Sequence, residues 1–156
     1  MDRQAKAAAR ALLLGLVLLA GCGTSSTDPN DQQDEDGHPP PEMVGVWIFQ
    51  SATFNDSPVA LADILDWEPG TAQAKLHIEA NGGYQYEEVN SSGGQTWAEG
   101  GWIFVDPEGG TIVIHSQYDS NGSNTDTSTI DYELAGGVLT LTVVEFSDTT
   151  VFTLTK

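Results

Sequence analysis

The chain has 156 residues, of which 23 are acidic and five are basic, giving a formal net charge of −18. This length leaves room for one domain once targeting and linker segments are set aside. A protein that binds nucleic acid needs clustered Lys or Arg to neutralise phosphates, so the composition argues against nucleic acid as a partner. The acidic excess is typical of a solubilising surface or, alternatively, of a surface adapted to high salt.

Residues 1–21 have the pattern of an export signal. Three basic residues within 1–10 precede an uncharged, mostly apolar run over 11–20. Ten residues are too few to cross a bilayer core, which needs about 20 apolar residues. The run ends in Leu19-Ala20-Gly21-Cys22, and Cys22 is the only cysteine. A lone cysteine in an exported chain has no intramolecular disulfide partner, so its thiol needs another explanation.

The segment 19–22 resembles the lipobox of bacterial lipoproteins. The resemblance implies cleavage between Gly21 and Cys22, a thioether lipid on the Cys22 sulfur and acylation of the new amine. Stable anchoring needs more than one acyl chain, and the lipoprotein pattern supplies three. We therefore expect a cell-envelope location, held by membrane lipid through Cys22. Gly23 is not an aspartate, which predicts the outer membrane if the cell has one, facing the periplasm or the surface. An ordinary cleaved signal peptide with a coincidental cysteine is the alternative.

Residues 22–43 are predicted to be the lipidated cysteine and a disordered tether. The stretch 23–42 has no large apolar side chain, contains six acids and ends in a run of prolines. Such a composition cannot bury enough surface to offset the entropy of ordering. Twenty residues reach at most about 70 Å when fully extended. Without residues 1–21 the chain holds 22 acids against Lys75 and Lys156, a net charge of about −20.

From residue 44 the chain alternates short apolar–polar segments with turn residues, which is typical of antiparallel strands. One helix is predicted over 58–67, with Ser57 as its N-cap and Pro58 in its first turn. Eight strands are predicted over 44–54, 72–80, 84–90, 96–105, 111–118, 125–134, 138–146 and 149–155.

Consecutive strands joined by short turns favour an all-β, eight-stranded antiparallel up-and-down barrel over 44–156, because closure removes exposed sheet edges. A β-sandwich of the immunoglobulin kind is the alternative. Gly45-Val46-Trp47 at the start of the first strand, and Asp131-Tyr132 later, are similar to motifs of lipocalins and of the looser bacterial lipocalin-like (calycin-type) domains. The similarity of pattern extends over the whole of 44–156.

In the lipocalin-like family the tryptophan of the opening G-x-W motif plugs one end of the barrel. A basic residue late in the last strand packs across its ring. The resemblance therefore implies that Gly45, Trp47 and Lys156 form a structural closure of the barrel. A lysine above an indole adds about 0.5–1 kcal/mol at an exposed site.

The resemblance and the strand alternation together predict an interior that binds a small hydrophobic ligand. The alternative is an envelope structural or protein-interaction lipoprotein in which the same aromatic rings fill the core. Inward-facing Ser51, Thr53 or Gly101 would leave space for a ligand. The candidate ligand-binding residues are Trp47, Phe49, Tyr84, Tyr86, Tyr132 and Phe152.

No enzymatic activity is expected. The domain has no G-x-S-x-G motif around a nucleophilic serine. Glu87 and Glu88 are neighbours in one predicted strand, so they point to opposite faces and cannot pair as catalytic carboxylates.

No cofactor and no metal are expected either. His77 and His115 lie on different predicted strands without ligand-like spacing, and a zinc site needs three or four convergent ligands. The loop 119–126 has oxygen-bearing side chains at alternate positions, but its glycine falls at the fourth position. Ile130 also stands where a calcium loop has a bidentate glutamate. We expect an ordinary hairpin loop there.

Overall fold

The computed structural model describes residues 37–106, 108–120 and 122–156, with the backbone alone at 123–126. Within these ranges nearly all of the regular secondary structure is β-strand. Its elements are β1 (Gly45–Phe54), β2 (Ser57–Val59), α2 (Leu61–Ile64), β3 (Thr71–Ile78), β4 (Gly83–Asn90), β5 (Gln95–Asp106), β6 (Thr111–Asp119), β7 (Gly122–Ala135), β8 (Val138–Glu145) and β9 (Asp148–Thr155).

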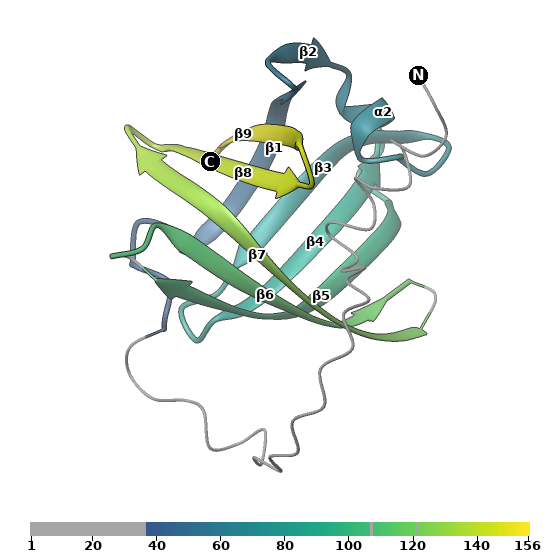
Figure 1. Cartoon of the computed structure of the whole chain (residues 1–156). Helices are drawn as coiled ribbons and strands as arrows, with labels where there is room; N and C mark the ends of the chain where they lie inside the picture. The colour runs from purple at the N-terminus through teal and green to yellow at the C-terminus, as the bar shows by residue number, and fades with distance from the viewer. Residues whose placement is uncertain (1–36, 107, 121) are drawn as a thin grey trace.

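The strands β1 and β3–β9 form one closed antiparallel barrel of eight strands (Figure 1). Each strand pairs with its sequence neighbour, and β9 pairs back with β1, for example at Ala52 and Phe152. The short β2 pairs with β1. Sequential order and closure confirm the predicted barrel and exclude the sandwich.

The barrel has two distinct ends. Strand β1 begins and β9 finishes at one of them, which we name the Trp47 end. The connection from β1 to β3 crosses the other, which we name the α2 end because it carries α2 and β2 (Figure 1). The turns β4–β5, β6–β7 and β8–β9 also lie at the α2 end, as the strand directions require.

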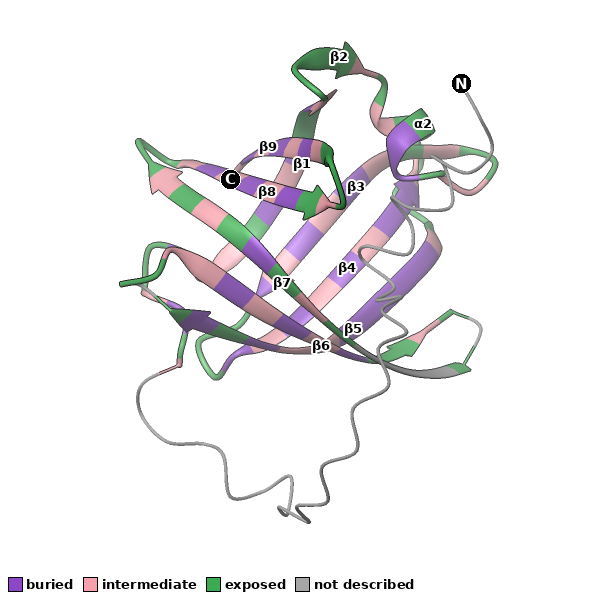
Figure 2. Ribbon diagram, viewed as in Figure 1, coloured by how far each residue is buried: buried purple, intermediate pink, exposed green. Residues whose placement is uncertain are grey.

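Side chains along the strands alternate between the interior and the solvent, as the sequence pattern predicts (Figure 2). Leu139, Leu141 and Val143 of β8 are buried, while Thr140 and Thr142 between them are partly exposed. Burying one apolar side chain in two is enough to fill a barrel of eight strands. The core also contains Met43, Leu76, Ile78, Ile103, Val105, Ile112, Ile114, Ile130 and Leu154.

The helix is much shorter than the predicted 58–67. Ser57 and Pro58 belong to β2, where Pro58 lies opposite Thr53 of β1, so neither starts a helix. Ala60 occupies the N-cap position without a side-chain cap hydrogen bond. The prediction was wrong because the hairpin of β1 with β2 satisfies the backbone of 57–59. Only the last part of the apolar pattern is helical, and Ile64 and Leu65 bury themselves in the core.

A bulge in β1 changes which residues face inward. The register of β1 against β9 shifts between Phe49 and Ser51. As a result Ser51 is exposed and Ala52 is buried, so Ser51 leaves no space in the interior. A bulge adds one residue to a strand and thereby inverts the alternation beyond it.

Residues 37–43, the end of the expected tether, pack against the barrel. Met43 is 0% exposed, and the N–H of Val105 donates to the carbonyl of Gly37 at 2.9 Å. The folded unit therefore begins before residue 44. In the part of the chain that the structure describes, no helix has the length and apolar character needed to cross a membrane.

Candidate functional site

Five of the six aromatic residues predicted to line the barrel are buried in it. Trp47 is 0% exposed and lies at the Trp47 end. Tyr132 is only partly buried and packs against the margin of the core. The other four are Phe49 (5% exposed), Tyr84 (4%), Tyr86 (2%) and Phe152 (4%).

Phe49 contacts two of the other rings edge to face. The ring centroid of Phe49 lies 5.8 Å from that of Tyr86 and 5.7 Å from that of Phe152. Tyr86 in turn lies 5.6 Å from Trp97, whose indole also faces the interior. Such pairs stabilise by about 0.5–1.5 kcal/mol each beyond their area burial. We name Phe49, Tyr86, Trp97 and Phe152, which these contacts join in the interior, the aromatic cluster.

At the Trp47 end the indole is held from two sides. Its Nε1 donates a hydrogen bond of 2.6 Å to the carbonyl of Met43. The Lys156 ammonium lies 4.8 Å from the ring centroid and donates to the carbonyls of Glu42 and Val44 at 2.7 and 2.9 Å. Lys156 thus joins the last strand to the segment that leads into the first.

Gly45 lies beside this lysine, and its backbone conformation favours glycine. It has φ +134, a conformation that side-chain-bearing residues rarely adopt, and a Cβ there would stand 3.5 Å from Lys156 Cε. The three residues Gly45, Trp47 and Lys156 therefore come together at one end of the barrel.

The interior also contains a buried glutamate that sequence reasoning missed. Glu99 of β5 is 0% exposed. Its Oε1 accepts hydrogen bonds from the hydroxyls of Tyr84 (2.6 Å) and Ser116 (2.7 Å). These two hydroxyls are also 2.8 Å apart, so β4, β5 and β6 each contribute one member of the group.

A second buried glutamate lies nearer the α2 end. Glu88 of β4 is 1% exposed. Its Oε1 accepts from the Tyr86 hydroxyl at 3.2 Å. Its Oε2 accepts from the N–H of Glu68 and the hydroxyl of Thr71, both at 3.0 Å. Glu88 therefore ties the segment after α2 to the barrel wall through the Glu68 N–H, while its other two donors belong to β3 and β4.

The two tyrosines are held in their neutral form. Burial, and then the neighbouring Glu99, raises the pKa of Tyr84 well above its ordinary value. Burial, and then Glu88, does the same to the pKa of Tyr86. Both hydroxyls therefore remain hydrogen-bond donors to the carboxylates at any physiological pH.

We name Tyr84, Tyr86, Glu88, Glu99 and Ser116 the interior polar cluster. Two carboxylates and three hydroxyls offer many hydrogen-bond acceptors in a region that is otherwise apolar. A carboxylate in such a place is costly unless donors or positive charge compensate it. The cluster is therefore the most polar feature of the barrel interior and the candidate functional site.

The signals for these acids were present in the sequence. Glu88 shares the inward parity of Tyr84 and Tyr86, so the prediction that Glu87 and Glu88 face opposite sides is correct and places Glu88 in the interior. Glu99 shares the parity of Trp97 and Ile103. The glycines that follow Glu99 concealed this alternation, and Gly101 lies at a bulge against β6, close to the carbonyl of His115.

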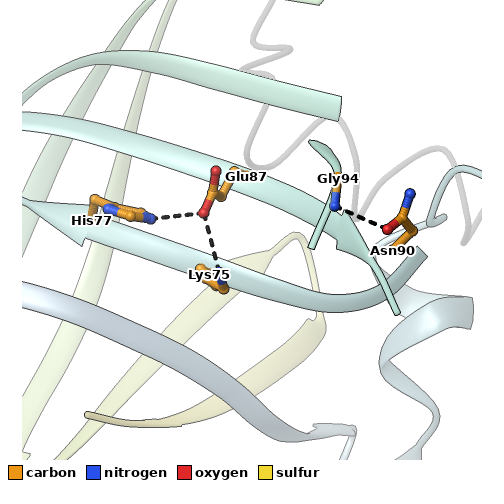
Figure 3. Close-up of polar contacts among 5 residues, drawn as sticks. All are labelled: Lys75, His77, Glu87, Asn90 and Gly94. Atoms are coloured by element: carbon orange, nitrogen blue, oxygen red, sulfur yellow. Dashed lines mark hydrogen bonds and ion pairs between the residues drawn. The ribbon is translucent and has the colours of Figure 1, made fainter. Parts of the chain in front are cut away.

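The outer face of β3 and β4 carries a small charged group (Figure 3). Glu87 Oε1 lies 3.0 Å from His77 Nε2 and 3.5 Å from Lys75 Nζ. Asn90 Oδ1 accepts from the N–H of Gly94 at 3.0 Å and shapes the following turn. Glu87 thus pairs with basic side chains on the outer face of the barrel, whereas Glu88 is buried inside it.

His77 and His115 do not meet. His115 Nδ1 lies 3.0 Å from the Thr127 hydroxyl, and its ring stands edge to face with Phe104 at 5.3 Å. Across the described residues, no three His, Cys, Asp or Glu side chains are grouped in a way that could hold a metal ion. Cys22 and the signal and tether residues up to 36 lie outside the described residues.

A search of protein families, of curated proteins and of solved structures found no significant match to this chain.

Proposed function

We propose that this chain is a lipid-anchored cell-envelope protein whose lipocalin-like barrel binds a small, largely apolar molecule with a hydrogen-bond-donating or positively charged head. The anchor is the acylated Cys22 implied by the lipobox at 19–22. The outer membrane is the proposed location in a cell that has one. The role is binding without catalysis.

The observation that carries the proposal is the interior polar cluster. Glu88 and Glu99 are 1% and 0% exposed inside a barrel of apolar side chains. The two lysines of the domain are used elsewhere, Lys75 on the outer face and Lys156 at the Trp47 end. A ligand head that donates hydrogen bonds or carries positive charge would complement these acceptors and offset their desolvation.

The apolar body of the ligand would lie against the aromatic cluster. Tyr86 and Trp97 lie opposite Glu99 and Glu88 in the pairing of β4 with β5, and Phe49 packs on Tyr86. Binding sites of this kind combine mostly apolar walls with a few polar groups that fix the orientation of the ligand. Access would be through the α2 end, where the segment 60–70 covers the barrel and Glu88 holds it.

A second candidate function is favoured by the same ring contacts. Phe49 packs on both Tyr86 and Phe152 at ordinary aromatic distances. If these rings fill the interior, the protein is an envelope interaction or structural lipoprotein, and the buried acids serve only to hold the fold.

Native mass spectrometry of the protein purified from its own membrane separates the two candidates. The binding proposal predicts a co-purified small molecule and quenching of tryptophan emission when an apolar amine is added. Repeated absence of any bound molecule, together with unchanged emission, would leave the interaction function as the better account.

A further inference from the structure

The turn between β8 and β9 exposes an aromatic side chain completely. Phe146 is 106% exposed, and Val144 two residues earlier is 60% exposed. They are the two most exposed large hydrophobic side chains in the described part of the chain. A single exposed apolar residue is common on protein surfaces, so exposure alone assigns no role.

The backbone conformation at Phe146 is the second observation. Glu145 pairs with Asp148, so Phe146 and Ser147 form a two-residue hairpin loop. Phe146 has φ +54, and Ser147 is not among the residues with positive φ. In two-residue loops with positive φ only at the first central position, glycine is the usual residue there. A bulky side chain in this conformation is strained, and such strain concentrates at functional sites.

The turn is held rigidly from the neighbouring β1–β2 turn. Asn55 Nδ2 donates to Asp148 Oδ1 at 2.9 Å, and Asn55 Oδ1 accepts from the N–H of Thr149 at 2.9 Å. The N–H of Asn55 also donates to the carbonyl of Thr149 at 2.8 Å. These bonds fix the backbone of the turn, so on binding a partner would have to order little more than the Phe146 side chain.

The charges around Phe146 indicate what kind of partner fits. Glu145 and Asp148 flank it in the hairpin, and Asp56 follows Asn55 in the supporting turn. Burial, and then Asp148, raises the pKa of Glu145, as expected for two neighbouring carboxylates. An acidic rim repels a second copy of the same turn and an anionic lipid surface. It attracts a surface rich in Lys and Arg.

The position in the fold agrees with this choice. The β8–β9 turn lies at the α2 end, whereas residues 42–44, through which the N-terminal segment joins the barrel, meet Lys156 at the Trp47 end. Phe146 therefore lies at the end of the barrel opposite the segment that leads to the expected membrane anchor.

We propose that the turn 145–148 is a docking tip for a protein partner. Phe146 inserts into an apolar pocket of that partner, and Lys or Arg residues at the pocket rim face Glu145 and Asp148. Aromatic anchors in pockets carry a large share of interface energy, with charges at the rim adding rate and specificity. The inference is independent of whether the barrel holds a ligand.

The test places a photo-crosslinking phenylalanine analogue at position 146 of the full chain, in cells that make the protein. The matched control places it at Phe104, which is also an exposed aromatic on the barrel wall (37% exposed). We expect one protein to be labelled from 146 but not from 104, through a peptide that combines apolar residues with Lys or Arg. Labelling should fall severalfold when Glu145→Gln and Asp148→Asn are added. Labelling of lipid, of a second copy or of the same proteins from both positions, or no labelling at all, would overturn the proposal.

A glycine variant separates docking from folding. Phe146→Gly suits the turn conformation, so its urea midpoint should equal or exceed that of the parent. Unlabelled parent chain, added to compete with the chain that carries the cross-linker, should suppress the cross-link. Unlabelled Phe146→Gly chain should not suppress it. A clearly lowered urea midpoint would show that Phe146 stabilises the fold. Equal suppression of the cross-link by the glycine variant would show that Phe146 does not contact the partner. Either result would refute the docking tip.

Discussion

Trp47 is the residue at which the two ends of the folded chain meet. Its indole donates to Met43 and lies beneath Lys156. The lysine is bound to carbonyls of the segment before β1, so it does more than cover the ring. The resemblance to lipocalin-like domains predicted that Gly45, Trp47 and Lys156 lie together. Composition and periodicity alone could not have linked Trp47 to Lys156, which is 109 positions later.

We expect Trp47→Ala to destabilise the domain by about 3–5 kcal/mol, the usual cost of truncating a buried large side chain. Lys156→Ala should cost less than this, because both its contact with the ring and its two hydrogen bonds to carbonyls are exposed to solvent. Urea midpoints of the chain lacking residues 1–22 would measure both. A Trp47→Ala midpoint close to that of the parent would contradict the role of Trp47 as the barrel plug.

The tyrosines of the interior polar cluster predict an alkaline transition. Their pKa values are raised above the ordinary tyrosine value of 10.0, so folding favours the neutral phenol. The resulting stability is fully present below the pKa of an unfolded tyrosine and is lost as pH rises through the folded-state pKa.

During an alkaline titration, two of the four tyrosines should therefore ionise only as the β-sheet signal is lost. Ultraviolet absorbance of tyrosinate and far-ultraviolet circular dichroism, recorded on the same sample, test this. Ionisation of all four with an intact circular dichroism spectrum would contradict the buried network.

Among the elements, the strands were predictable and the helix was not. The alternation of apolar and polar residues located all eight barrel strands, because each strand buries one face. In β8, for example, Leu139 and Leu141 are buried and Thr140 between them is partly exposed. The helix was overestimated because an apolar pattern over 58–67 cannot reveal that β2 pairs with β1. Glu99 was missed for a different reason. Its parity with Trp97 and Ile103 is continuous along β5, but Gly100 and Gly101 have no side chains that would show the alternation between them.

The segment after α2 should depend on Glu88. Replacing Glu88 by Ala removes the acceptor of the Glu68 N–H and of the Thr71 hydroxyl. Loss of such hydrogen bonds to a charged group costs about 1.5–3 kcal/mol, so amide exchange at Glu68 should accelerate about tenfold or more.

The matched control for this experiment is Glu87→Ala, which removes an outward carboxylate from the same strand. It should leave exchange at Glu68 unchanged. Hydrogen exchange followed by mass spectrometry or nuclear magnetic resonance reads both variants. Equal acceleration in the two would mean that Glu88 does not hold the α2 end in place.

At the scale of the whole molecule, the expected lipid anchor and the barrel are separate parts of the chain. The signal, Cys22 and most of the tether precede the described residues, so their roles remain predictions from the lipobox pattern. The chain should incorporate a clickable fatty acid in cells and sediment with membranes. Cys22→Ala should lose both properties. A Cys22→Ala chain that still takes up label or stays membrane-bound would refute lipidation at this residue.

The central claim is that the interior polar cluster selects the head of a ligand. Calorimetric titration of the chain lacking residues 1–22 with dodecylammonium and with dodecanol, below their aggregation limits, tests it directly. We predict that the ammonium binds about tenfold or more tightly, the value of one charge-assisted hydrogen bond. Glu99→Gln should abolish this preference, and the outward Glu87→Gln should keep it. Equal affinity of the parent for both probes, or binding of neither, would contradict the account.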